Sequence, residues 1–222
     1  MLTSPAPTQV RRHSKEASPM TKTVRSAVVA AMIGAAALGL VGVATAASGP
    51  QEQQVVNYLT GLLQDFDAQA GSLSSLDDPA PTQELEATTA SYSSGAAGTG
   101  TQTVVVKVYQ NLGAAPPATW FKAFSYDNAA KAPVTFGTLF RAGSTPLEVI
   151  APMVARQLSA DAGQVITIDP AVGLDPATYQ NFAVTDDAVL FFFDRDQLHP
   201  AYGETEVSIP RAALAGLLSP GL

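Results

Sequence analysis

Apolar and polar positions between residues 179 and 193 form the pattern around which the rest of the chain is organised. Two short runs of branched and aromatic side chains lie on either side of Asp186-Asp187, and this arrangement predicts a β-hairpin. In the second run, residues 188–193, side chains on both faces of the strand are apolar. Such a strand is expected to be central in its sheet and covered on both sides. The predicted core residues of the hairpin are Phe182, Val184, Leu190, Phe191, Phe192 and Phe193.

Helical periodicity occurs in two longer stretches. Apolar residues recur every three or four positions from residue 50 to 68, which predicts an amphipathic helix. The segment Thr145-Pro146-Leu147-Glu148 has the spacing of a capping box, with Pro at the first helical position. Gly163 is placed to end that second helix, and Pro152 inside it predicts a kink or a break.

The remaining pattern mixes strands and short helices without strict alternation. Residues 70–83 have the composition of a linker. Further strands are predicted at 84–93, 101–110, 119–126, 164–168 and 204–209, and short helices at 135–140, after Asp175-Pro176, and at 210–218. The fold class that follows is α+β: a mainly antiparallel sheet packed against two or three helices, with a sheet-and-helix core at 84–218 in a single domain.

The first 46 residues do not have the pattern of a folded domain. Basic residues precede an unbroken apolar run, residues 27–43, and Ala44-Thr45-Ala46 follows. This order predicts a signal peptide over 20–46, with cleavage between Ala46 and Ala47. An uncleaved membrane anchor is the alternative, although 17 residues fall short of a bilayer core about 30 Å thick. Residues 1–19 are interpreted as a misassigned start or a disordered leader, since Met20 begins an ordinary signal peptide.

Cleavage would leave a secreted domain, 47–222, in the extracellular space or cell wall and without stable membrane association. That domain holds 7 basic and 18 acidic residues, a formal charge of −11. Such a charge repels phosphate backbones, which argues against nucleic acid as a partner. The chain has no cysteine, although exported proteins often use disulfides, so its stability must come from the core. We expect a monomer.

Residues for hydrolytic catalysis are scarce. The predicted mature chain has one histidine, His199, and no G-x-S-x-G motif, so a nucleophile with a conventional base is not indicated. Asp194-Arg195-Asp196 begins like a calcium loop but lacks the later ligands. We predict no catalytic residues, no metal and no cofactor. Asp186 and Asp187 are interpreted as turn residues rather than as paired catalytic carboxylates.

Several segments together resemble a known family. They are T-Q-T-V-V-V-K-V-Y-Q-N at 101–111, F-K-A-F at 121–124, the stretch 173–193 and V-S-I-P-R at 207–211. In this combination they closely resemble the secreted immunogenic proteins of mycobacteria, the MPT/MPB antigens. The second half also resembles a wider extracytoplasmic domain that includes the lysozyme-binding ectodomain of an anti-sigma factor.

The resemblance implies a secreted α+β protein without established catalytic residues. It implies a binding partner that is a protein or a component of the cell envelope, a lysozyme-like protein being one candidate. By this resemblance, family members of the antigen type carry an extra N-terminal β segment with a cysteine pair before the first helix. This chain goes almost directly from the predicted signal peptide to the helix, so we expect that segment to be missing. The leading hypothesis is a secreted, non-catalytic binding protein, and the alternatives are a secreted esterase or other hydrolase and a membrane-anchored extracytoplasmic sensor.

Overall fold

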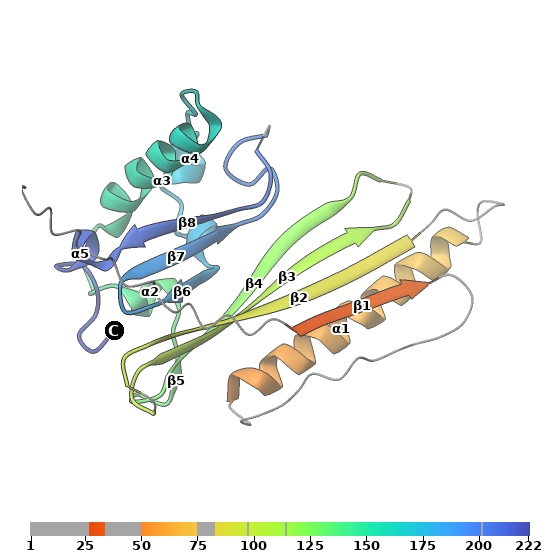
Figure 1. The fold of residues 1–222 in the computed structure, drawn as a ribbon, viewed down its shortest axis with the longest axis horizontal. Helices are drawn as coiled ribbons and strands as arrows, with labels where there is room; N and C mark the ends of the chain where they lie inside the picture. Colours follow the sequence, from red (N-terminus) through yellow and green to blue (C-terminus); the bar gives the residue numbers. More distant parts are fainter. Residues whose placement is uncertain (1–26, 34–49, 75–82, 97, 114, 201) are drawn as a thin grey trace, which may run out of the picture.

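The computed structural model of the protein describes residues 27–33, 50–74, 83–96, 98–113, 115–200 and 202–222. Two antiparallel sheets lie at the centre, and helices cover their outer faces (Figure 1). This architecture confirms the predicted α+β class. The predicted cleavage residues Ala44, Ala46 and Ala47 lie outside the described residues.

The first sheet is built from long hairpins. Its strands, in the order β1-β2-β3-β4-β5, are β1 (Ala27–Ile33), β2 (Gln83–Ser94), β3 (Thr101–Asn111), β4 (Ala118–Asp127) and β5 (Ala132–Pro133). β3 is central, because three consecutive valines favour extended backbone and Val106 is fully buried. Val106 is opposite Thr89 on β2 and Lys122 on β4. The three strands predicted at 84–126 are therefore confirmed.

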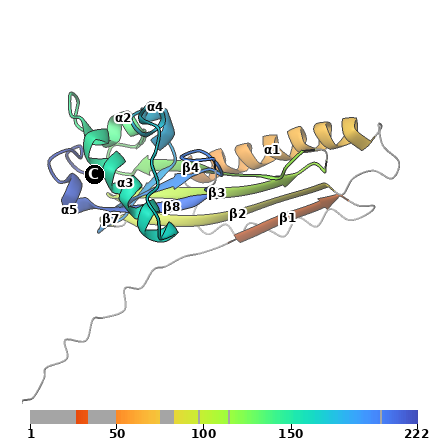
Figure 2. The same ribbon diagram turned by 90° about the horizontal axis from the view of Figure 1, so that it is seen from above.

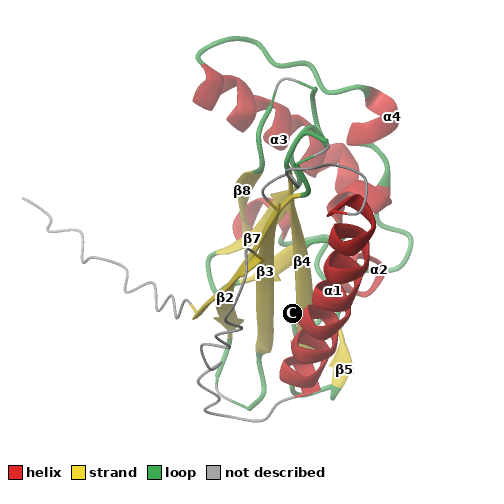
Figure 3. Ribbon diagram, turned by 90° about the vertical axis from the view of Figure 1, so that its right-hand side faces the viewer, coloured by secondary structure: helices red, strands yellow, loops and turns green. Residues whose placement is uncertain are grey.

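One face of the first sheet packs against helix α1 (Pro50–Ser74), which runs alongside the long strands (Figure 3). Phe66 is fully buried among Leu85, Val106 and Val108. The helix is longer than predicted, since it continues past residue 68 to Ser74. Ala70 explains the extension, because it is buried against the sheet and its carbonyl accepts a hydrogen bond from Gln83 Nε2 at 3.1 Å.

The second sheet contains the predicted hairpin. Its strands are β6 (Phe182–Val184), β7 (Ala188–Phe193) and β8 (Thr205–Pro210), in the order β6-β7-β8. β7 is the middle strand, with Phe191 opposite Phe182 on one side and Val207 on the other. Every residue of β7 is buried. The prediction of a central strand covered on both faces is confirmed.

The outer face of the second sheet is covered by short helices and one long one. They are α2 (Phe136–Leu139), α3 (Pro146–Ala162), α4 (Pro170–Gly173), the 3₁₀ helix η1 (Pro176–Tyr179) and α5 (Arg211–Leu214). Tyr179 anchors this layer, because its ring meets those of Phe191 and Phe193 edge to face at 5.5 Å. Its buried hydroxyl donates to the Gly173 carbonyl at 2.9 Å.

The inner faces of the two sheets pack on each other where they overlap (Figure 2). Phe192 is 3% exposed, and its ring lies 5.4 Å from that of Phe121 and 5.6 Å from that of Tyr92. Burial first, and then the negative charge and hydrogen bond of Glu206, raise the pKa of Tyr92 to about 12. The alternation along β7 thus divides its side chains between two different hydrophobic clusters.

Helix α3 departs from its predicted start and interior. Thr145 makes no side-chain cap; its hydroxyl instead donates to Glu148 at 3.0 Å. The helix passes through Pro152 without a break, so the prediction of a break there is wrong. Gly163 ends the helix as predicted, in the left-handed conformation with φ 65°.

Two other predicted elements differ in the structure. Residues 164–168 form no strand; the Ile166 N–H instead donates to the Ser159 hydroxyl at 2.9 Å. The predicted helix 210–218 is shorter than expected. α5 ends at Leu214, and Leu218 forms an isolated bridge with Phe140.

Strand β1 lies within the predicted signal peptide. It pairs with the outer edge of β2, with Ala27 opposite Thr89 and Ile33 opposite Gln83. The signal peptide at 20–46 stays a prediction. A chain cleaved after Ala46 would lose β1 and would have β2 as the edge of its first sheet.

Candidate functional site

The residues of the predicted hairpin are structural. Phe182, Val184, Phe191 and Phe193 belong to the cluster under α3, and Leu190 and Phe192 belong to the cluster between the sheets. Since all of them are buried, none is placed to contact a ligand directly. The candidate site must be sought at the ends of the strands.

The loop after β7 contains His199, and its hydrogen bonds hold it to strand β4. Asp194 accepts a hydrogen bond from the Phe121 N–H at 2.7 Å, and the Arg195 N–H donates to the Thr119 carbonyl at 3.1 Å. Both contacts satisfy backbone groups along β4. Burial raises the pKa of Asp194, and the hydrogen bond from Phe121 partly opposes this shift.

Asn181 also forms hydrogen bonds with backbone groups of β4. Its Oδ1 accepts from the Ala123 N–H at 3.1 Å, and its Nδ2 donates to the Phe121 carbonyl at 2.9 Å. Side chains of the second sheet therefore pair with the free backbone groups of β4, which covers that sheet edge. Sequence reasoning missed this role, because nothing in the local pattern indicates which distant backbone an Asn or Asp will reach.

Three charged side chains lie close together near these contacts between the sheets. Lys107 Nζ is 3.0 Å from Glu204 Oε1, and Arg195 is 3.7 Å from the other oxygen of that carboxylate. Burial acts to raise the pKa of Glu204, but the hydrogen bond from Lys107 and the two positive charges outweigh it, so the pKa is lowered. These residues are partly exposed, and such ion pairs contribute at most about 1 kcal/mol each.

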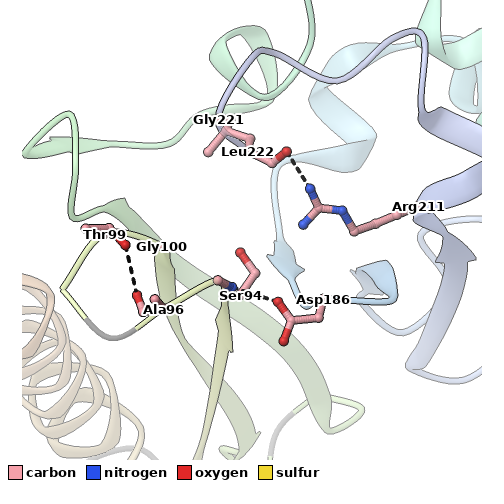
Figure 4. Close-up of a pocket in the computed structure, with 9 residues that line it drawn as sticks. Ser94, Ala96, Thr99, Gly100, Asp186, Arg211, Gly221 and Leu222 are labelled. Atoms are coloured by element: carbon pink, nitrogen blue, oxygen red, sulfur yellow. Dashed lines mark hydrogen bonds between the residues drawn. The ribbon is translucent and has the colours of Figure 1, made fainter.

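A polar cavity of about 430 Å³ lies at the other end of β7 (Figure 4). Three segments far apart in the sequence form it: the β2–β3 turn, the β6–β7 turn and the end of the described chain. The lining residues are Ser94, Gly95, Ala96, Thr99, Gly100, Asp186, Arg211, Gly221 and Leu222.

Asp186 joins two of these segments. It lies in the predicted turn, which is closed by the Thr185 N–H donating to the Ala188 carbonyl at 2.9 Å. Its carboxylate accepts a hydrogen bond from the Gly95 N–H at 2.7 Å. Gly95 has φ 70° and Gly100 leaves no room for a Cβ against the Ser94 carbonyl, so glycine is required at both positions.

Arg211 forms the opposite wall of the cavity. Its backbone N–H donates to the Asp187 carbonyl at 2.8 Å, which fixes it next to the β6–β7 turn. Its guanidinium donates to the Thr185 carbonyl at 3.1 Å and to the Leu222 carbonyl. In the sequence, Arg211 stands out only as the last residue of the V-S-I-P-R segment. Its place beside the cavity follows from the fold.

Two features of the cavity bear on acyl transfer. The Ser94 hydroxyl is buried and lies 2.6 Å from that of Thr101, and His199 is not among the residues that line the cavity. The cavity lies at the start of β7 and His199 follows the end of that strand, whose six residues at about 3.3 Å each span roughly 20 Å. A nucleophile and its base must lie within hydrogen-bond distance.

Two further properties are limited to the part of the chain that the structure describes. There, no three His, Cys, Asp or Glu side chains gather as a metal site would require. Within the same residues, no helix has the length and apolar character needed to cross a bilayer.

Sequence relatives place the chain in a family. Immunogenic protein MPB64 of Mycobacterium bovis is 43% identical over 171 residues, which cover 77% of this chain and 74% of that protein. This chain belongs to the MPB64 family of immunogenic proteins. The family that the sequence segments indicated is thereby confirmed.

Another relative of this chain is named for an activity. The Esterase Rv3036c of Mycobacterium tuberculosis is 41% identical over 169 residues, covering 76% of this chain and 73% of that protein. A family model described as a protein of unknown function (DUF3298) matches residues 137–212. The crystal structure of a member of that family from Bacteroides fragilis has a TM-score of 0.47 and 17% identity, covering 78% of this chain and 71% of the other.

Proposed function

We propose that the chain is a secreted, non-catalytic binding protein that engages a protein or cell-envelope partner outside the cell. The observation that carries the proposal is the polar cavity, in which Asp186 and Arg211 are held by backbone contacts from separate segments. Charged groups fixed in this way are prepared for recognition, since little ordering is needed when a ligand arrives. By resemblance, a lysozyme-like protein is one candidate partner.

Secretion is the first part of the proposal to test. Cleavage after Ala46 predicts that culture supernatant contains a protein whose first residue is Ala47 or lies within one or two positions of it. N-terminal sequencing of the supernatant and of the membrane pellet measures this. Finding only the uncleaved chain in the pellet would instead support the membrane-anchored alternative.

Partner capture tests the binding part. Exported protein is immobilised and exposed to cell-wall material and host fluid, alongside Asp186→Asn and the matched variant Asp187→Asn. Both substitutions remove one exposed carboxylate, but only Asp186 lines the cavity. We expect wild type and Asp187→Asn to retain the same partner and Asp186→Asn to retain clearly less. Equal retention by all three would mean that the cavity is not the binding surface.

Esterase activity is the second candidate function, because a 41% identical relative bears that name. It would require His199 or an unusual base, since the predicted mature chain has no other histidine. His199 follows the end of β7 and the cavity lies at its start, and the strand spans roughly 20 Å, which weighs against a shared active site there. Hydrolysis of p-nitrophenyl esters by the exported protein, with and without His199→Ala, separates the two functions.

A further inference from the structure

The two sides of the first sheet are protected in different ways. On the β4 side, groups from the second half of the chain bond the outward-facing backbone of every second residue. The β4 residues bonded in this way are Thr119, Phe121, Ala123 and Ser125. A strand whose backbone groups are already paired offers no template to another chain, so this side of the sheet is closed.

The opposite side of the sheet is formed by β2, and β1 covers it (Figure 1). The pairing with β1 extends from Gln83 to Thr89 of β2. β1 lies within the predicted signal peptide, so the predicted cleavage after Ala46 removes it. Every second residue of β2 then directs its backbone N–H and C=O groups away from the sheet, without a strand to receive them.

β2 lacks the features that usually protect an edge strand. Such strands are commonly short, bent by a bulge, interrupted by Pro or supplied with Lys. β2 is 12 residues long and contains neither Pro nor Lys, and its pairing with β3 continues from Glu84 to Ser94 without a bulge. Its two charges, Glu84 and Glu86, stand near its start, so residues 87–93 are uncharged.

We propose that the edge of β2 is a protein-binding surface, opened by removal of the signal peptide, that takes an extended segment of a partner protein as an added antiparallel strand. In strand addition, main-chain hydrogen bonds supply the affinity. β1 already occupies this edge in antiparallel register with seven residues that are all uncharged and apolar.

Charge selects the partner segment. Glu84 and Glu86 stand on the edge strand itself, and the predicted mature chain has a formal charge of −11. Both repel acidic segments, so the segment that binds is apolar, or apolar with basic flanks. A second copy of this chain is a poorer occupant, because two chains of −11 repel each other as they approach.

The inference rests on the proposed binding function and on the predicted cleavage, and it names a protein as the partner. β2 ends at Ser94, which also lines the polar cavity, so one end of an added strand would lie beside that cavity. The two proposals can fail separately. Capture of a partner that leaves the β2 amides unaffected would refute only this inference, and a His199-dependent hydrolase would refute the proposed function.

The test is an NMR titration of backbone amides in exported protein with a synthetic peptide of residues 27–33 that carries two Lys at each end. Two control peptides are N-methylated at the odd-numbered or at the even-numbered residues of 27–33. Because only alternate residues of a strand bond a given neighbour, we expect one control to bind at least tenfold more weakly than the other. The unmodified peptide should give saturable shifts centred on residues 83–94. Absence of these shifts, or equal affinity of the two controls, would overturn the proposal.

The state of the exported protein is checked in the same samples. N-terminal sequencing shows whether residues 27–33 are gone, and light scattering measures the mass. We expect a monomer without residues 27–33. A chain that retains them would keep β1 in place, and a dimer with protected β2 amides would show that a second copy takes the edge. Either result would overturn the proposal.

Variants test the register. Ala27 is opposite Thr89, so the first Lys of the peptide, two positions before Ala27, falls opposite Ser91. Ser91→Lys should weaken binding of the peptide about two- to fivefold and Ser91→Glu should strengthen it, since charges on adjacent strands interact in this way. Ser208→Lys is the matched control, because Ser208 is also exposed, on β8 at the edge of the second sheet. Equal losses in Ser91→Lys and Ser208→Lys would refute strand addition at β2.

Discussion

Replacing Phe192 with alanine tests the central position of β7. Phe192 is 3% exposed and packs against Phe121 and Tyr92 between the two sheets. Removing its ring forfeits about 1.5–3 kcal/mol of burial and about 0.5–1.5 kcal/mol for each aromatic pair. With a residual cavity, the free energy of unfolding should fall by about 3–5 kcal/mol. That is a large part of the typical total of about 5–15 kcal/mol.

Urea denaturation followed by tyrosine and tryptophan fluorescence measures this loss. The midpoint should fall while the denaturant slope stays constant, since the surface exposed on unfolding barely changes. Val165→Ala is the control, because Val165 is 88% exposed and should change stability by less than about 0.5 kcal/mol. A loss below about 1 kcal/mol in Phe192→Ala would show that the sheets do not pack on each other through this residue.

Two further substitutions test single contacts. Tyr179→Phe removes only the hydroxyl that donates to the Gly173 carbonyl, and leaving that buried acceptor unpaired should cost about 1–3 kcal/mol in urea unfolding; a cost below about 0.5 kcal/mol would contradict the bond. Asp194→Asn tests pH dependence: burial raises the folded-state pKa of Asp194 above its unfolded value, so the native state binds its proton more tightly and stability declines as pH rises through the folded pKa. Asparagine can still accept from Phe121 but does not titrate, so wild type should lose stability relative to the variant as pH rises above the ordinary Asp value of about 4; parallel curves for the two proteins would refute the assignment.

The central hairpin was predictable from local pattern. Residues 188–193 are apolar on both faces, and only a middle strand with cover on each side can bury both. The long strands β2, β3 and β4 followed from branched residues bounded by Gly- and Pro-containing turns. Gly163 ended α3 because its left-handed conformation suits glycine.

The predicted secondary structure was wrong where tertiary contacts override the local sequence pattern. Residues 164–168 have the alternation of a strand, but the Ile166 N–H donates to the Ser159 hydroxyl instead of to a neighbouring strand. α1 continues through a Gly- and Ser-containing segment because Ala70 is buried against the sheet. Propensity is a weak predictor in such places.

The candidate site was not predictable from the sequence. Asp186 was correctly interpreted as a turn residue, but its bond to Gly95 joins positions 91 residues apart. No periodicity or motif encodes such a meeting, since each partner is ordinary in its own segment.

The most direct test of a non-catalytic function is hydrolysis of p-nitrophenyl esters by the purified exported protein, with and without His199→Ala. His is the side chain whose ordinary pKa suits a general base near neutral pH, and the predicted mature chain has no histidine other than His199. We expect a rate no greater than that of an equal mass of an inert acidic protein, and no change in His199→Ala. A rate well above that control, abolished in His199→Ala, would make this protein an enzyme and refute the non-catalytic function.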